Sequence, residues 1–365
     1  MLLSPFDLGP LALPNRIVLA PLTRSRHPRQ VPTALAPTYY AQRASAGLLI
    51  AEATQISGRG QGYPDTPGIY TEEQAEAWER VTGLVHAVGG RIALQLWHVG
   101  RVSHSAYHDG APPVAPSPLA APGQVMRPDF SMTDFETPHA LTGDEIAQTV
   151  QDYRHGARLA RQAGFDAVEI HAANGYLIEQ FLSSGTNRRD DAYGGSLDGR
   201  LRFLDEVTEA VLAEWPADRV GARLSYGAGA NGVVDERPEE TFGAVAERLD
   251  AAGLAYLHGI RASSHSGTDT GELDVIALTR SHFSRAVIAN ADFDRLEGEA
   301  LLATGAADLV AYGRPFLSTP DLPIRFAAQE AGLTAPLNAP DRSTFYGGGA
   351  PGYTDYPIWD GLSAE

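Results

Sequence analysis

The segment H-A-A-N-G-Y, residues 171–176, places an imidazole, a carboxamide and a phenol close together in the chain. It directly follows the apolar run D-A-V-E-I, which is typical of a short buried strand, and it precedes a stretch with helical spacing. Core packing does not require three hydrogen-bonding groups at the end of a strand. His171 and Asn174 can instead polarise one oxygen of a substrate, while Tyr176 can donate a proton.

Other apolar runs also end in polar, small or aromatic residues. These are Thr23, Ala53 with Thr54, Gln95 with Trp97 and His98, Arg223, and Gly313 with Arg314. Gly313 permits close approach of the backbone to a phosphate, and the guanidinium of Arg314 forms a fork for its oxygens. Arg223 would be a buried cation that requires a negative partner, and Gln95 offers a donor and an acceptor to a pyrimidine-like edge. A phosphorylated, planar cofactor fits these groups, and flavin mononucleotide (FMN) is the candidate.

Eight short apolar runs must position these groups, and helical patterns separate most of them. The runs cover residues 16–23, 47–54, 91–98, 166–171, 220–226, 255–261, 286–291 and 308–314. Candidate helices lie near 33–46, 71–89, 142–164, 199–214, 237–252, 274–284 and 294–305. Thr142 stands three residues before Glu145, which is the spacing of a capping box, and Pro238 begins another helix.

This alternation predicts one α/β domain over residues 1–365, a single (β/α)₈ TIM barrel. In such a barrel the active site lies at the C-terminal ends of the strands. An open, doubly wound sheet is the alternative that periodicity leaves open. Residues 101–141, after the third strand, are too long for an ordinary connection, so we expect a loop insertion that caps the site. His98, His104 and His108 cluster nearby but match no zinc spacing, and no metal site is predicted.

The composition excludes several classes of chemistry. The chain contains no lysine and no cysteine, which excludes Schiff-base catalysis, thiolate nucleophiles, disulfides and iron–sulfur clusters. Its net charge of −17 disfavours nucleic acids and anionic membrane surfaces as partners. The N-terminus lacks the pattern of a signal peptide, and no run approaches the roughly 20 apolar residues of a membrane span. We therefore expect a cytoplasmic protein.

Motifs along nearly the whole chain resemble the Old Yellow Enzyme family of flavin-dependent ene-reductases. They are P-N-R-I-V-L-A-P-L-T-R (14–24), E-A-T-Q-I-S (52–57), L-Q-L-W-H-V-G-R (94–101), H-A-A-N-G-Y-L-I-E-Q-F-L (171–182), N-R-R-D-D-A-Y-G-G-S (187–196), Y-G-R-P-F (312–316) and F-Y-G-G-G-A-P-G-Y-T-D-Y-P (345–357). The resemblance implies a (β/α)₈ barrel with non-covalently bound FMN and with NADPH or NADH as the reductant. Thr23, where another branch carries Cys, implies the branch typified by the yeast and enterobacterial enzymes.

The resemblance also implies roles for single residues. Those expected to bind FMN are Pro21, Leu22, Thr23, Ala53, Gln95, Arg223, Ala291, Gly313 and Arg314. His171 and Asn174 would bind the carbonyl or nitro oxygen of the substrate, and Tyr176 would protonate its Cα. Tyr63, Trp97 and Tyr346 would form the aromatic walls of the substrate pocket. The turn A-N-A-D-F-D (289–294) departs from the family because it lacks a glycine and places Asp292 near the phosphate.

The activity implied is the NAD(P)H-dependent reduction of activated alkenes, namely α,β-unsaturated carbonyl or nitro compounds, in a ping-pong cycle. The expected partners are small molecules, without nucleic acid or membrane, and the expected assembly is a monomer or a homodimer. Two alternatives remain open: a phosphate-binding barrel lyase or isomerase without flavin, and a flavin-binding module without alkene turnover. The absence of lysine argues against the Schiff-base members of the first class. Tyr176 argues against the second, because storage of a flavin requires no proton donor.

Overall fold

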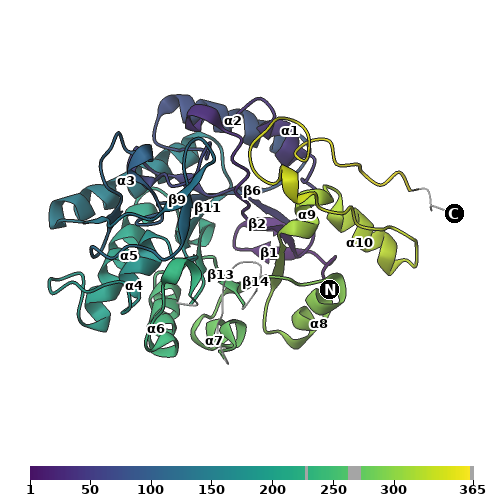
Figure 1. Cartoon of the computed structure of the whole chain (residues 1–365). Coiled ribbons are helices and arrows are strands. Elements are labelled where there is room, and N and C mark those ends of the chain that lie inside the picture. Colours follow the sequence, from purple (N-terminus) through teal and green to yellow (C-terminus); the bar gives the residue numbers. More distant parts are fainter. Residues whose placement is uncertain (227–228, 262–272, 362–365) are drawn as a thin grey trace.

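The computed structural model describes residues 1–226, 229–261 and 273–361. Its centre is a closed barrel of parallel strands surrounded by helices (Figure 1). The barrel strands are β3 (Ile17–Leu19), β4 (Leu48–Ile50), β6 (Ile92–Trp97), β11 (Ala167–Ala172), β12 (Val220–Leu224), β13 (Tyr256–Ile260), β14 (Ala286–Asn290) and β15 (Leu309–Tyr312). The barrel closes because β11 pairs with both β12 and β6, while the short β5 (Thr54–Gln55) extends the pairing along β6. Each predicted run coincides with one barrel strand, with β11 ending one residue beyond its run, so the predicted fold is confirmed.

Helices lie at each range that the sequence pattern predicts. They are α1 (Ala36–Ala41), α2 (Glu72–Ala87), α3 (Gly143–Gln162), α5 (Leu197–Leu212), α6 (Pro238–Ala251), α7 (Val275–His282) and α8 (Arg295–Thr304). Thr142 and Glu145 form the predicted capping box of α3, and Pro238 occupies the first turn of α6. The short α4 (Leu177–Leu182) follows β11. No helix within the described ranges is long and apolar enough to cross a membrane.

Two helices near the C-terminus were not expected. They are α9 (Arg314–Ser318), which starts directly after β15, and α10 (Leu322–Glu330). The first is too short to show a helical period in the sequence. Both have proline in the first turn, where it is compatible with a helix because the first N–H groups have no partner within the helix.

An antiparallel hairpin closes the end of the barrel at which the strands begin. It consists of β1 (Phe6–Leu8) and β2 (Leu11–Leu13), which precede β3. Leu8, Leu11 and Leu13 are buried in one cluster with inward-facing residues such as Val18 and Ile50. Because strand side chains alternate, Ile17 and Leu19 instead pack in the cluster shared with the helices. This half of the barrel interior is therefore apolar.

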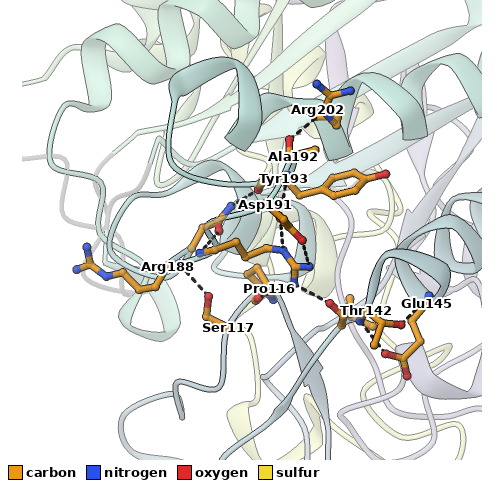
Figure 2. A network of polar contacts seen from close by, with 12 residues as sticks. Pro116, Ser117, Thr142, Glu145, Arg188, Asp191, Ala192, Tyr193 and Arg202 are labelled. Atoms are coloured by element: carbon orange, nitrogen blue, oxygen red, sulfur yellow. Dashed lines mark hydrogen bonds and ion pairs between the residues drawn. The ribbon is translucent and has the colours of Figure 1, made fainter.

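The excursion after β6 forms two pairs of short strands. Strand β7 (Val114–Ala115) pairs in parallel with β10 (His139–Ala140), and β8 (Gln124–Met126) forms an antiparallel hairpin with β9 (Met132–Asp134). The base of the excursion is bound to the loop after α4 (Figure 2). The Arg189 guanidinium donates to the carbonyls of Pro116 at 2.9 Å and Leu141 at 2.6 Å, and the Arg188 N–H donates to Ser117 Oγ at 2.8 Å. Arg189 also forms an ion pair with Asp191.

Candidate active site

Polar side chains from neighbouring strands occupy the C-terminal half of the barrel interior. His171 on β11, Arg223 on β12 and His258 on β13 are direct neighbours in the sheet register. Two residues before His171, Glu169 lies directly opposite Gln95 of β6. All five residues are buried. They share one face of the sheet because strand side chains alternate with a period of two residues. The half of the barrel opposite the apolar hairpin is therefore a polar site.

Aromatic rings surround His171 at the mouth of the barrel. The ring of Tyr176 lies edge-on to both His171 and Trp97, with centroids 5.1 Å apart in each case. Tyr63 stacks on Trp97 at 5.6 Å, and its hydroxyl lies 3.1 Å from the hydroxyl of Tyr176. Ala53 is buried in the same cluster as Trp97. Tyr63 and Trp97 thus lie where pocket walls are expected, and Tyr63 is in addition a hydrogen-bond partner of Tyr176.

The surroundings set the protonation states of His171 and Tyr176. Burial raises the pKa of Tyr176 well above its ordinary value, and Tyr63 adds to the effect, so the phenol is protonated at neutral pH. Burial lowers the pKa of His171 well below its ordinary value, with contributions from Arg223 and His258, so the ring is neutral. His171 Nδ1 is buried without a partner among the described residues. Both groups can therefore donate a hydrogen bond to a neutral or anionic oxygen.

The backbone around Asn174 is held by residues that the sequence pattern did not single out. Asn174 has φ +57°; its N–H donates to Ser225 Oγ at 2.7 Å, and its carbonyl accepts from Asn231 Nδ2 at 2.8 Å. Ser225 Oγ donates in turn to the buried Glu179 at 2.8 Å, which also accepts from the Gly175 N–H at 2.6 Å. The left-handed turn directs the chain from β11 into α4, with Tyr176 as the residue before the helix. In the sequence, the only indication of this network is the carboxylate of Glu179 in the otherwise uncharged segment Y-L-I-E-Q.

Arg223 is buried among groups that only partly satisfy it. Its Nη2 donates to Asn290 Oδ1 at 2.7 Å, whereas its Nε has no partner among residues 1–226, 229–261 and 273–361. Burial lowers the pKa of Arg223, and the negative charge of Glu169 opposes that effect. The negative partner that the sequence required is thus Glu169, acting through its charge.

The expected phosphate end of the site contains an ion pair between protein groups. Gly313 and Arg314 stand where β15 ends and α9 begins, and the Arg314 guanidinium pairs with the carboxylate of Asp292. Ala291 has φ +96° and Asp292 has φ +50°, a left-handed turn that glycine normally favours. Arg261 fixes this turn by donating to the carbonyls of Ala291 at 2.7 Å and Asp292 at 2.9 Å. Asp292 is therefore directed onto Arg314.

The remaining predicted residues follow β3 or lie in the C-terminal segment. Pro21 is buried, and Leu22 and Thr23 are half-buried where the chain leaves the barrel. Tyr346 is 55% exposed. Burial raises the pKa of both Tyr63 and Tyr176, and Tyr346 contributes to a smaller extent. Its loop is bound to the segment after β3, because the Gly347 N–H donates to the Arg24 carbonyl at 3.0 Å.

The excursion after β6 reaches this site at two points. Phe135 packs against the cluster that contains Trp97. At the tip of the β8–β9 hairpin, Phe130 lies beside Gly347, where a Cβ atom would be 3.2 Å from its ring. His98, His104 and His108 take part in separate local hydrogen bonds. The described part of the chain contains no group of three or more acidic or histidine residues that could hold a metal ion.

FMN fits the groups that line this site. The buried Nε of Arg223 and the carbonyl oxygen of Gln95 provide a donor and an acceptor for the edge of a planar, hydrogen-bonding ring system. His171 Nδ1 and Trp97 Nε1 are two further buried polar atoms without partners among the described residues. The guanidinium of Arg314 would bind a phosphate after its ion pair with Asp292 opens. These groups are too polar for an apolar core and suit a cofactor of this kind.

Comparisons with known proteins agree in both sequence and structure. The model of the NADH:flavin oxidoreductase / NADH oxidase family matches residues 1–331. 12-Oxophytodienoate reductase 1 of Oryza sativa subsp. japonica is 45% identical over 369 residues, covering 100% of this chain and 94% of the relative. Morphinone reductase in complex with tetrahydroNAD is 49% identical with a TM-score of 0.92, covering 98% of each chain. An old yellow enzyme homologue from Zymomonas mobilis is 41% identical with a TM-score of 0.93, covering 98% of this chain and 99% of that one.

Proposed function

The chain belongs to the NADH:flavin oxidoreductase / NADH oxidase family, and we propose that it is an FMN-dependent ene-reductase. Its substrates are activated alkenes, namely α,β-unsaturated carbonyl or nitro compounds, and its reductant is NADPH or NADH. The observation that carries this proposal is the convergence of a neutral His171 and a protonated Tyr176, with ring centroids 5.1 Å apart, above buried polar groups that suit a flavin. The names of the relatives, reductases of an oxophytodienoate and of morphinone, support the substrate class.

When bound, FMN supplies the redox centre through which a hydride passes from the reduced nicotinamide to the alkene. Gln95 and Arg223 would hold its ring, and Gly313 and Arg314 its phosphate. The complex of morphinone reductase with tetrahydroNAD supports a nicotinamide as the other reactant. Oxidant and reductant use the same pocket in turn, which is a ping-pong cycle.

The residues of the chain hold the alkene and supply its proton. His171 and Asn174 donate to the carbonyl or nitro oxygen, whose negative charge grows as the alkene is reduced. Tyr176 delivers its proton to Cα, and the hydroxyl of Tyr63, 3.1 Å away, orients the phenol through their hydrogen bond. Trp97 and Tyr63, whose rings stack at 5.6 Å, exclude water from this side of the pocket.

Several finer assignments belong to the same proposal. We assign the chain to the branch typified by the yeast and enterobacterial enzymes, an assignment that Thr23 supports. The excursion 101–141 caps the site, a role supported by the packing of Phe135 against the Trp97 cluster. The protein acts in the cytoplasm on small molecules, as a monomer or homodimer, without nucleic acid or membrane partners; its net charge of −17 supports the last point.

The test is the visible spectrum of the purified protein, recorded without oxygen, first alone and then with NADPH or NADH. The expected flavin spectrum bleaches with at least one of the two reductants and returns when 2-cyclohexenone is added. A flavin that bleaches but does not return would contradict alkene reduction. A colourless protein that takes up no FMN would contradict the whole proposal.

A further inference from the structure

Glu169 and His258 form a buried pair for which the proposed mechanism has no role. Glu169 Oε2 lies 2.9 Å from His258 Nδ1, and both side chains are 0% exposed. They belong to β11 and β13, so the contact crosses over β12. A buried charged pair costs desolvation free energy and is retained only where its partners compensate. Its neighbours therefore indicate what the pair does.

Gly221 lies on the strand that this contact crosses. It lies between Glu169 and Tyr256 in the register of the barrel. A Cβ atom at this position would lie 2.2 Å from the Tyr256 ring, which fills the space that a side chain would take. Because β12 carries no side chain here, the Tyr256 ring fits beside Glu169, whose carboxylate reaches over β12 to His258. A glycine inside a strand often marks such a close approach.

The pair consists of a carboxylate and a neutral imidazole. Burial alone would raise the pKa of Glu169, but His258, Arg223 and Gln95 outweigh it and lower that pKa. Burial lowers the pKa of His258; Glu169 opposes this effect and Arg223 adds to it. Since an ionised carboxylate only accepts hydrogen bonds, the hydrogen between the two side chains resides on His258 Nδ1.

The second oxygen of Glu169 determines the orientation of Gln95. Gln95 Nε2 donates to Glu169 Oε1 at 2.6 Å, and the two residues are cross-strand neighbours. The amide cannot turn round, because its carbonyl oxygen would then face a carboxylate oxygen. The carbonyl oxygen of Gln95 is left as an acceptor. Gln95 is also the residue expected at the edge of the flavin ring.

We propose that Glu169 is a positioning residue that presents Gln95 to the flavin as a hydrogen-bond acceptor and lowers the reduction potential of the bound flavin. The inference rests on the proposed function, because it requires FMN in the barrel. Reduction adds negative charge to the cofactor, which the cation of Arg223 favours. The carboxylate of Glu169 acts on the same guanidinium and offsets part of that attraction. His258 keeps the carboxylate ionised through its hydrogen bond.

The test compares reduction potentials of FMN-loaded variants. Glu169→Gln keeps the shape but removes the charge, and the new amide lets Gln95 turn round. We expect the ratio of reduced to oxidised flavin at a fixed poise to rise at least tenfold, a positive shift of about 30 mV for a two-electron couple. Glu169→Asp retains the charge, so its potential should lie closer to that of the wild type. His258→Leu, which removes the donor, should shift the potential upward, and His258→Gln, which retains a donor, should shift it less.

Glu52→Gln is the matched control. Glu52 is also fully buried and lies 2.9 Å from a histidine ring, that of His27, but Arg24 and Tyr40 are its other contacts. This variant should leave the potential unchanged. Folded Glu169→Gln or His258→Leu with the wild-type potential would overturn the inference, and if Glu169→Gln fails to fold, the two His258 variants decide. A wild-type protein that binds no FMN would instead refute the proposed function.

Discussion

Among the described residues, two histidine–glutamate pairs are buried with the same 2.9 Å contact and different surroundings. In the first, Glu52 also accepts from the Arg24 N–H at 3.1 Å, and His27 Nδ1 accepts from the Thr33 N–H at 3.2 Å. This pair therefore binds backbone segments to one another. In the second pair, Glu169 is bonded among the described residues to the side chains of His258 and Gln95. Arg223 acts on it through its charge, and burial together with Glu169 raises the pKa of Tyr256. The second pair therefore orders side chains inside the site.

A buried histidine–glutamate contact can therefore have two different roles, and the other partners of the glutamate decide which. The pair of Glu52 should contribute mainly to the free energy of unfolding, because it orders backbone. The pair of Glu169 should act mainly on the cofactor, because its charge and orientation are transmitted to residues of the barrel interior. Variants at the two kinds of position should therefore separate changes in the free energy of unfolding from changes in the reaction rate.

Tyr176→Phe should affect chemistry without stability. The variant keeps the ring contacts with His171 and Trp97 but removes the proton, so alkene reduction should slow by roughly 10²–10⁴-fold. Reduction by NADPH or NADH should change less than a few fold. Stopped-flow measurement of the two half-reactions separates them. Equal slowing of both would refute the role of proton donor.

Glu52→Gln should affect stability without chemistry. Two N–H donors, of His27 and of the Arg24 backbone, converge on this carboxylate, so the NH₂ group of glutamine must face one of them. The expected loss is about 1–3 kcal/mol in the free energy of unfolding. Urea denaturation of the loaded protein measures it, and both half-reactions serve as the control. An unchanged free energy of unfolding combined with slower flavin or alkene reduction would contradict a purely structural role for Glu52.

Asp292→Asn offers a third, more exposed carboxylate for the comparison. Asp292 and Arg314 are about one-third exposed, so their ion pair is weak, yet it occupies the cation expected to bind the FMN phosphate. Removing the charge should lower the FMN dissociation constant roughly fivefold, since pairs of this kind are worth up to about 1 kcal/mol. Asparagine tolerates the φ of +50° at this position. Fluorescence titration of the apoprotein tests this, and weaker binding would show that Asp292 helps to hold the cofactor.

The smallest expected effect is an absence of pH dependence. Tyr176 donates only while protonated, and its raised pKa keeps it so well into the alkaline range. His171 loses its neutral form only as the pH falls through its lowered pKa. The rate of alkene reduction should therefore be flat from about pH 7 to about pH 9. A change in the rate of alkene reduction with an apparent pKa between these pH values would show that another group controls proton transfer.

The sequence pattern predicted the barrel well because its signals are local. Apolar runs and helical periods show strands and helices directly. Seven of the eight barrel strands fall within the predicted runs, and β11 extends one residue beyond its run. The hairpin β1–β2 and the strand pairs of the excursion escaped detection, since strands of two or three residues show no period. Helices α9 and α10 were not predicted either, and α9, with five residues, is too short to show a helical period.

Part of the candidate site could likewise be predicted from local sequence signals, and part could not. The order of strand-end residues in the sequence was enough to predict that His171, Gln95 and Arg223 share the mouth of one barrel, because parallel strands end at one edge. The sequence contains Glu169 as a lone carboxylate in an apolar run and His258 as a lone imidazole, 89 residues away. Only the register of β11, β12 and β13 in the folded sheet brings them together. Contacts across strands depend on which side chains meet in space, and a linear pattern does not contain that information.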